Sequence, residues 1–425
     1  WKFKDGVFTV WGNGAVTDTS GFSAYKTKTI SVIVEKGITE IKGFNGFNEL
    51  AEVSFSEGLE AIGQSAFWNC SNLKEINLPE SLKEIKWSAF RECKGLREIT
   101  LPSQVTNVEA YAFYNCINIE KIIIKGNIIN GGAAFGNVGA GIVNEDGEVV
   151  GTKVIYSSEV KEIGSIIFSD SSIGSVSFPE GLEKISASAF ARCNFLKKIE
   201  LPKSLKEIAS GAFYNCTHMT YLKINSLDCI YKRNSSYQLI AFSGCGTSED
   251  EGLKVVFSDD IEKIPNIGLK DANLRSVQLS KQAKVICDNA FDGCANLKSI
   301  VIPDSVTEIG AKVFRECKEL SSIELSHELL VIGDSAFYGC SSLSSIDLPD
   351  SLVSVGQDAF AECTGFRKIS IPRNVTTVGR GGFQKCTNVS QIIINGSINS
   401  SYNIFSQVGT TAINEMGEAL GLEVE

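Results

Sequence analysis

Several residue types on which chemistry commonly depends are scarce in this sequence. Only eight prolines, two methionines and two histidines occur among 425 residues, so a cluster of histidines is excluded. Lysine and arginine form no cluster and the net charge is −10, which argues against sequence-independent binding to nucleic acid. No apolar run approaches the roughly 18 residues of a membrane span. The Cys-x-x-Cys spacing, typical of zinc and redox sites, is absent.

The sequence shows no signal peptide, and its first residue is a tryptophan. We interpret the chain as a mature or trimmed product from which a signal peptide has been removed. The missing signal is therefore no argument for the cytoplasm.

A phenylalanine returns at a nearly constant interval along most of the chain. Spacings of 22 or 23 residues separate most of these residues, and Leu269 fills a gap in the series. The units number about 16 and have a consensus close to L-x-x-I-x-L-P-x-x-L-x-x-I-x-x-x-A-F-x-x-C. Seven of the eight prolines directly follow the third apolar residue: Pro79, Pro102, Pro179, Pro202, Pro303, Pro349 and Pro372. A period of this length indicates stacked repeats.

Each unit reads as one coil of a stack. The segment L-x-x-I-x-L predicts a short strand with its apolar residues inward, and the proline ends the strand because it has no N–H to donate. A second segment such as SLKEI (81–85) predicts another extended piece, and SAFREC (88–93) predicts a tight helical turn. One unit cannot bury its apolar face alone, so neighbouring coils must share one continuous core.

A longer period divides the stack into blocks. Residues 29–41, 152–163 and 253–264 resemble one another, and 122–150 has a counterpart at 392–420. Each block should end in an enlarged, glycine- and serine-rich coil that protrudes. We expect an N-terminal β cap at 1–29, a solenoid at 30–411 with blocks of about 30–151, 152–252 and 253–411, and a C-terminal tail or cap at 412–425.

These units resemble the BspA-like family of leucine-rich repeat proteins, since the proline, the Ala-Phe pair and the cysteine all hold register over about residues 30–410. The opening WKFKDGVFTVWGNG is similar to the small cap found before such repeats. The expected fold is an α/β solenoid, a leucine-rich repeat right-handed superhelix with a parallel β-sheet, about 16 coils and a small N-terminal β cap. The resemblance also implies a secreted or surface-anchored bacterial protein, often host-associated, that acts in adhesion or coaggregation.

Eleven of the 13 cysteines stand three residues after the landmark aromatic. Other units carry Phe47, Val138 or Ala272 there, so the position is apolar and a thiol behaves as a small hydrophobe. Zinc needs four converging ligands, whereas one cysteine per coil gives a line of sulfurs. Disulfides between coils are within reach, but side chains in register point the same way. We predict buried free thiols, with disulfides or metal as alternatives; off-column Cys229 and Cys287 are packing residues or exposed thiols.

We find no catalytic constellation and expect no enzyme, no cofactor and no metal site. His218 and His327 lie about five coils apart in a rigid stack, so they cannot share a site. The glycine-rich GNVGAG (136–141) does not open a βαβ unit. The acidic NEDGE (144–148) and SEDEG (248–252) lack the ligand pattern of a calcium loop, so we interpret them as solvated turns.

The strand face is the first of three candidate binding surfaces. Leucine-rich repeats generally bind partners on this concave sheet, and the alternative is a solvated face without a partner. The candidate residues here are Lys74, Glu75, Asn77, Arg97 and Glu98.

The other two candidate surfaces are a side-chain column and an irregular segment. Trp68, Arg91 and Tyr114 directly follow the landmark phenylalanine in adjacent coils, which predicts a cation–π ladder that holds a sugar or a partner's side chain, or that only stabilises the stack. The segment YKRNSSYQ is either a binding loop on a rigid scaffold or a loosely ordered insertion. Its candidate residues are Tyr231, Arg233 and Tyr237.

The sequence therefore predicts a non-enzymatic, extracellular or cell-surface solenoid that binds a protein in an adhesin-like role. We expect a monomer with no membrane span and no nucleic acid partner. The alternatives are a glycan-binding module that uses exposed aromatics, and a structural spacer that presents another domain.

Overall fold

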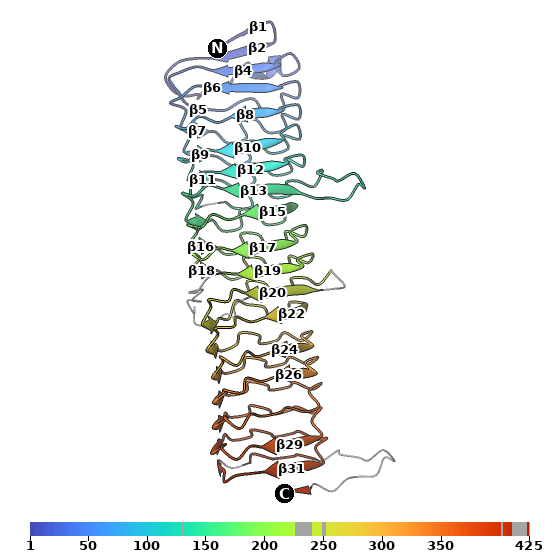
Figure 1. Ribbon diagram of the computed structural model, residues 1–425. Helices are drawn as coiled ribbons and strands as arrows, with labels where there is room; N and C mark the ends of the chain where they lie inside the picture. The colour runs from blue at the N-terminus through green and yellow to red at the C-terminus, as the bar shows by residue number, and fades with distance from the viewer. Residues whose placement is uncertain (130, 226–239, 249–251, 401–402, 410–422, 425) are drawn as a thin grey trace. The chain divides into compact units, whose positions relative to one another are not determined.

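The computed structural model describes residues 1–129, 131–225, 240–248, 252–400, 403–409 and 423–424. The chain forms two compact units, Trp1–Met219 and Thr220–Glu425. Each unit is built from parallel strands that stack coil upon coil (Figure 1). The predicted parallel-sheet solenoid is confirmed. Within the described ranges the only helix is the short 3-10 helix η1 (Phe22–Tyr25).

The N-terminal cap is a β-hairpin that joins the first sheet. Strands β1 (Lys2–Lys4) and β2 (Val7–Val10) pair antiparallel across a two-residue turn. Asp5 and Gly6 make this turn with φ angles of 51° and 84°, the left-handed pair that a tight hairpin requires. Strand β2 then pairs in parallel with β4 (Ser31–Val34), so the predicted β cap is present and covers the edge of the first coil.

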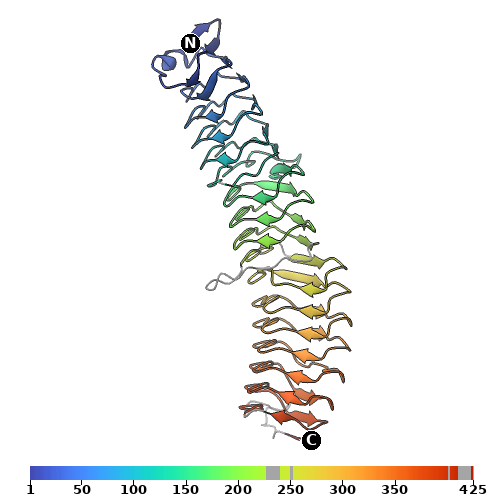
Figure 2. The ribbon, with the colours of Figure 1, turned by 90° about the vertical axis from the view of Figure 1, so that its left-hand side faces the viewer.

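Two rows of strands run along the first unit. The longer strands form one row: β4, β6 (Glu52–Phe55), β8 (Glu75–Asn77), β10 (Glu98–Leu101), β12 (Lys121–Ile124), β13 (Thr152–Tyr156), β15 (Ile173–Ser177) and β17 (Lys198–Leu201). The shorter row, seen at the left of Figure 1 and facing the viewer in Figure 2, contains β3 (Gly14–Ala15), β5 (Ile38–Ile41), β7 (Ala61–Ile62), β9 (Glu84–Ile85), β11 (Asn107–Val108), β14 (Glu162–Ile163), β16 (Lys184–Ile185) and β18 (Glu207–Ile208).

The alternation of side chains within each long strand fixes which face is solvated. In β10, Ile99 and Leu101 are fully buried, whereas Glu98 points outward. Because β10 pairs with β12 in register, Ile99 stands opposite Ile122 and the apolar residues form a continuous column. The charged residues of successive strands therefore line up on the outer face.

The segment around the landmark phenylalanine forms the third side of each coil. We call this side the turn wall; it contains the residues from three before to two after this phenylalanine. Ser65 and Asn69 have φ angles of 52° and 57°, and the N–H groups of Ser65, Phe67 and Asn69 donate to the next coil over 2.9, 2.8 and 2.7 Å. The expected helical turn is therefore wrong. The segment makes β-turns, because a residue with left-handed φ recurs at every fourth position and alternate N–H groups donate to carbonyls of the next coil.

A stack of phenylalanine rings fills the core behind the turn wall. Phe90 lies between Phe67 and Phe113, with ring centroids 5.3 and 5.2 Å apart and ring planes within 9° of parallel. All three side chains are fully buried. Offset aromatic stacking adds to the large apolar area that each ring buries, so the landmark phenylalanine is the main packing element of a coil.

The second unit repeats this plan. Its long strands are β19 (Tyr221–Ile224), β20 (Leu253–Phe257), β22 (Leu274–Gln278), β24 (Ser299–Val301), β26 (Ser322–Glu324), β29 (Lys368–Ile371), β31 (Gln391–Ile394) and β33 (Glu423–Val424). Its short strands are β21 (Lys263–Ile264), β23 (Val285–Ile286), β25 (Glu308–Ile309), β27 (Val331–Ile332), β28 (Ser354–Val355), β30 (Thr377–Val378) and β32 (Asn399–Ser400).

One of the expected enlarged coils is described in detail. Before β13 the chain forms a hairpin in which Val143 and Val149 face each other and the Asn144 N–H donates to the Glu148 carbonyl over 2.9 Å. This hairpin projects from the coil in Figure 1. Its acidic tip is the NEDGE segment, and its backbone turn is closed by the Asn144 side chain, which accepts from the N–H groups of Asp146 and Glu148.

Candidate functional site

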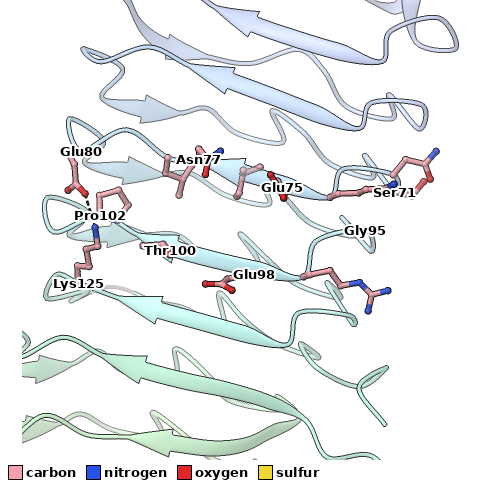
Figure 3. A pocket seen from close by; sticks show the side chains of 14 residues that line it. Ser71, Glu75, Asn77, Glu80, Gly95, Glu98, Thr100, Pro102 and Lys125 are labelled. Carbon is pink, nitrogen blue, oxygen red and sulfur yellow. Dashed lines mark hydrogen bonds and ion pairs between the residues drawn. The ribbon is translucent and has the colours of Figure 1, made fainter. Parts of the chain in front are cut away.

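A groove on the strand face of the first unit gathers the candidates that the sequence placed there. It has a volume of about 850 Å³ and lies across β8, β10 and the turns that flank them. Its lining includes all five predicted strand-face residues, Lys74, Glu75, Asn77, Arg97 and Glu98. Figure 3 shows Glu75 and Asn77 of β8 beside Glu98 and Thr100 of β10 on this face. We call this feature the strand-face groove.

Part of the charge in the strand-face groove is already paired within the protein. Glu98 accepts from Lys121 over 2.7 Å, and Arg97 donates to Glu120 over 3.3 Å. These pairs form because residues in neighbouring parallel strands stand directly opposite one another. Where the strands end, Lys125 donates to Glu80 over 2.9 Å and thereby lowers the pKa of that carboxyl (Figure 3).

Lys74 and Glu75 differ from these pairs. Neither forms an ion pair with any residue in the described part of the chain, and both are exposed. Glu75 also stands in register with Glu52 of β6, so two carboxylates face each other without a cation between them. Like charges in this arrangement are unfavourable. A cationic group from outside the chain would therefore be favoured at this point of the groove.

The predicted ladder of Trp68, Arg91 and Tyr114 is present on the turn wall. The Arg91 guanidinium lies 5.6 Å from the Trp68 ring centroid and 5.2 Å from that of Tyr114. The Arg91 Nε also donates to Glu92 over 3.4 Å, which balances its charge. These three residues do not line the strand-face groove, so the two predicted surfaces are separate.

Two aromatic residues beside this ladder were missed at the level of the sequence. Trp87 and Tyr111 are 38% and 40% exposed, and Tyr111 meets Tyr114 edge-on with ring centroids 5.4 Å apart. They stand three and two residues before their landmark phenylalanines, positions at which neighbouring coils carry Gln64 and Ser65. Alignment of the repeats could have found them, because a tryptophan or tyrosine replaces a small or polar residue there.

The third predicted surface cannot be placed. Tyr231, Arg233 and Tyr237 lie outside the described residues, and so does Cys229. Their role as a binding loop stays a prediction.

The predicted burial of the cysteine column is confirmed. The 12 cysteines of the described ranges carry free thiols, and all but the half-buried Cys287 are buried. At least ten of the eleven column thiols also donate a hydrogen bond to a carbonyl of the preceding coil: the Cys93 Sγ, for example, donates to the Phe67 carbonyl over 3.1 Å. Ser171, which replaces cysteine in one unit, donates to the equivalent carbonyl of Phe135. Where the position carries cysteine or serine, the side chain is thus both small and a hydrogen-bond donor, whereas Phe47, Val138 and Ala272 fill it without this bond.

Burial makes these thiols poor nucleophiles. It raises the pKa of Cys70, Cys116, Cys340 and Cys386 to about 12. Because the thiolate is the reactive and metal-binding form, a thiol with such a pKa stays protonated and unreactive at neutral pH.

The remaining titratable residues form no chemical centre in the described part of the chain. No three histidine, cysteine, aspartate or glutamate side chains converge there to hold a metal ion. His327 is exposed and lies 2.9 Å from Asp304, whose pKa is lowered by the backbone N–H and the ring of this histidine. His218 packs parallel to Phe195 at 6.2 Å. Nor do the described helices include one long and apolar enough to cross a membrane.

Comparison with known proteins identifies the repeat. The family described as "BspA type Leucine rich repeat region (6 copies)" matches residues 19–138, 151–249, 240–342, 262–390 and 309–416. No curated protein matches the chain. The matched segments thus span most of the sequence.

Among solved structures, the chain is similar to a leucine-rich repeat protein from Bacteroides ovatus, with 22% identity, 87% of each chain covered and a TM-score of 0.49. It is also similar to a leucine-rich cell surface protein from Faecalibacterium prausnitzii, with 20% identity over 100% of this chain and 88% of the other and a TM-score of 0.33. For the pneumococcal vaccine antigen PcpA the identity is 18%, the coverage 88% and 79%, and the TM-score 0.32.

Proposed function

Because this chain belongs to the BspA-type leucine-rich repeat family, we propose that it is a non-enzymatic solenoid, secreted or held at the cell surface, that binds a protein partner in an adhesin-like role. The observation that carries the proposal is the strand-face groove, which combines about 850 Å³ of space with charged groups that have no partner within the described chain.

The division of charge in the strand-face groove supports a protein ligand. Lys74 and Glu75 can each meet an opposite charge of a partner without first breaking a pair of the chain itself. Arg97 and Glu98 are held in ion pairs by Glu120 and Lys121, so their positions are fixed beside the unpaired Lys74 and Glu75. Complementary charges of this kind give specificity and raise the association rate more than they raise affinity. A rigid sheet also keeps these groups in place before the partner arrives.

The test is a binding screen of the full chain against extracellular matrix proteins by biolayer interferometry. For any protein that binds, the exchange Lys74→Glu with Glu75→Lys should weaken binding at least tenfold and change its dependence on salt, because it reverses the free charges at constant net charge. The matched control is Lys298→Ser with Ser299→Lys, which exchanges the equivalent positions of β24 in the second unit and should leave binding unchanged. Binding that survives the first exchange would contradict the groove as the site.

A second candidate function is the capture of a glycan. The observation that favours it is the aromatic ladder on the turn wall, where Arg91 holds the exposed Trp68 against rotation. Replacement of Trp68 and Tyr114 by alanine should then abolish glycan binding. If neither a matrix protein nor a glycan binds, the chain is a spacer that presents another domain.

A further inference from the structure

The exposed aromatic residues of this protein are concentrated on one part of the turn wall. Five tryptophan or tyrosine side chains are exposed among the described residues, and three of them, Trp68, Trp87 and Tyr111, lie in adjacent coils of the first unit. Soluble proteins seldom expose aromatic side chains together unless the patch binds something. We call Trp68, Trp87, Arg91, Tyr111 and Tyr114 the turn-wall cluster.

Within the turn-wall cluster, the ring faces are not equally accessible. Arg91 covers one face of Tyr114, and Gly136 packs so close to this ring that a Cβ added there would come within 2.9 Å of it, so the protein itself occupies much of the surface of Tyr114. Arg91 also covers one face of Trp68. Tyr114 is half-buried, whereas Trp68 stays 37% exposed, so the ladder fixes the cluster and leaves only part of its own ring surface for a ligand.

Trp87 and Tyr111 provide the open surface. Trp87 makes no ring–ring or cation–π contact with any described residue. The residues at its position in the next two coils are Ala110 and Gly132, so its own column supplies no long side chain to cover the indole. Tyr111 stands one position further along the next coil, where its ring is braced edge-on by Tyr114. The two open rings thus belong to adjacent coils of the turn wall and stand one position apart.

The stability of the stack does not require these aromatic residues. In the second unit the same backbone ladder joins Asn289, Phe291 and Gly293 to the next coil over 2.9, 3.0 and 2.8 Å. There the residues that directly follow the landmark phenylalanines include Asp292 and Arg315, which form a two-pronged ion pair over 2.8 and 2.7 Å. Asp288 and Asn289 take the positions of Trp87 and Tyr111 in the coil of Phe291, so the backbone ladder forms without aromatic residues there.

The chemistry of the turn-wall cluster indicates the class of ligand. Arg91 is balanced by Glu92, and the Glu109 carboxylate beside Trp87 adds a negative charge that disfavours an acidic ligand. Polar groups flank the open rings: the Glu109 Oε2 accepts the backbone N–H of Trp87 over 2.8 Å, which leaves Oε1 for a ligand, and Gln64 is exposed in the preceding coil. A neutral molecule with an apolar face and a rim of hydroxyl groups matches this arrangement, because its face stacks on the rings and its hydroxyls donate to the carboxylate.

From this arrangement we infer that Trp87 and Tyr111 form the centre of a binding site for a neutral carbohydrate, with Trp68, Arg91 and Tyr114 holding the site in shape. The inference deepens the second candidate function and rests on it. It is independent of the strand-face groove, whose lining contains none of these residues.

The test begins with a glycan array probed with the full chain, followed by calorimetry with the neutral oligosaccharide that binds best. Two variants use residues that the neighbouring coils already carry at the same positions, so both should fold: Trp87→Gln, as at Gln64, and Tyr111→Ser, as at Ser88. Each should lower the affinity at least tenfold. The matched control is Tyr338→Ala, which removes a tyrosine from the turn wall of the second unit and should leave the affinity unchanged.

Four outcomes overturn the inference: no neutral glycan binds, only acidic glycans bind, binding survives both variants, or Tyr338→Ala weakens binding equally. Loss of matrix-protein binding in Trp87→Gln and Tyr111→Ser, without any glycan binding, also overturns it and assigns the cluster to a protein interface. The exchange of Lys74 and Glu75 separates the two proposals, because it should affect protein binding alone.

Discussion

Alkaline pH should unfold this protein, because its buried thiols cannot ionise while the coils stay stacked. Burial raises the pKa of nine column cysteines in the folded chain: Cys70, Cys93, Cys116, Cys193, Cys294, Cys317, Cys340, Cys363 and Cys386. In an unfolded chain a cysteine has a pKa of about 8.5. The folded pKa is thus the higher one, so the stabilisation is complete below about pH 8.5 and is lost as the pH rises towards the folded value.

The size of this effect follows from the number of thiols. Each thiol that ionises only after unfolding lowers the free energy of unfolding by about 1.4 kcal/mol per pH unit. Between pH 8 and pH 10 this amounts to about 2 kcal/mol per thiol, and for the whole column to on the order of 15 kcal/mol. The loss equals the upper range of ordinary protein stability, about 5–15 kcal/mol. We therefore expect the coils to unfold between about pH 9 and pH 11.

Circular dichroism and tryptophan fluorescence, recorded against pH in the presence of a non-thiol reductant, measure this transition. Replacement of Cys317 and Cys340 by valine removes two titrating groups. Valine already occupies the equivalent position of another coil, as Val138. The double variant should lose about 4 kcal/mol less stability than the wild type between pH 8 and pH 10. The half-buried Cys287→Val provides the control with a smaller change. A transition that is absent up to pH 11, or that does not move in the double variant, would refute the reasoning.

Two further pairs of substitutions probe the packing and the ion pairs, each measured as urea unfolding by fluorescence. Phe90→Ala should lower the free energy of unfolding by about 3–5 kcal/mol because it empties a fully buried site between two stacked rings. Phe90→Leu should lower it by less than about 2 kcal/mol, since Leu269 fills the same position in another coil. Equal losses in the two variants would contradict the stacking argument. Arg315→Ala should lower the free energy of unfolding by about 2–3 kcal/mol because it leaves Asp292, whose side chain is only 11% exposed, without its ion-pair partner. Arg97→Ala breaks an exposed pair and should lower it by less than about 1 kcal/mol. A larger loss in Arg97→Ala than in Arg315→Ala would show that burial does not decide the contribution of these pairs.

The repeat made most of the fold predictable from the sequence. The apolar spacing and the proline after each strand located the long strands, as for β8 before Pro79 and β10 before Pro102. The turn wall was mistaken for a helical turn because its hydrogen bonds run to the next coil, and a single unit does not reveal them. Left-handed residues such as Ser88 and Glu92 carry no sequence signature of that conformation, since neither is glycine or asparagine.

The candidate site was predictable in part. The register of the coils was enough to place Lys74, Glu75 and Arg97 on one face, and to bring Arg91 between Trp68 and Tyr114. Which charges are free depends on distances between side chains of neighbouring coils, and the sequence holds no such distances. The exposure of Trp87 and Tyr111 was missed for the same reason, because the shape of the turn wall decides which of its positions face solvent.

The central claim is that a protein partner binds in the strand-face groove, and a hydrogen–deuterium exchange footprint of the complex tests it most directly. With a matrix protein captured in the screen, amide exchange should slow in peptides that cover residues 71–102, which supply most of the groove lining. The equivalent strands β24 and β26 should exchange at the same rate with and without the partner. Protection that is absent from 71–102, or that is confined to other coils, would contradict the account.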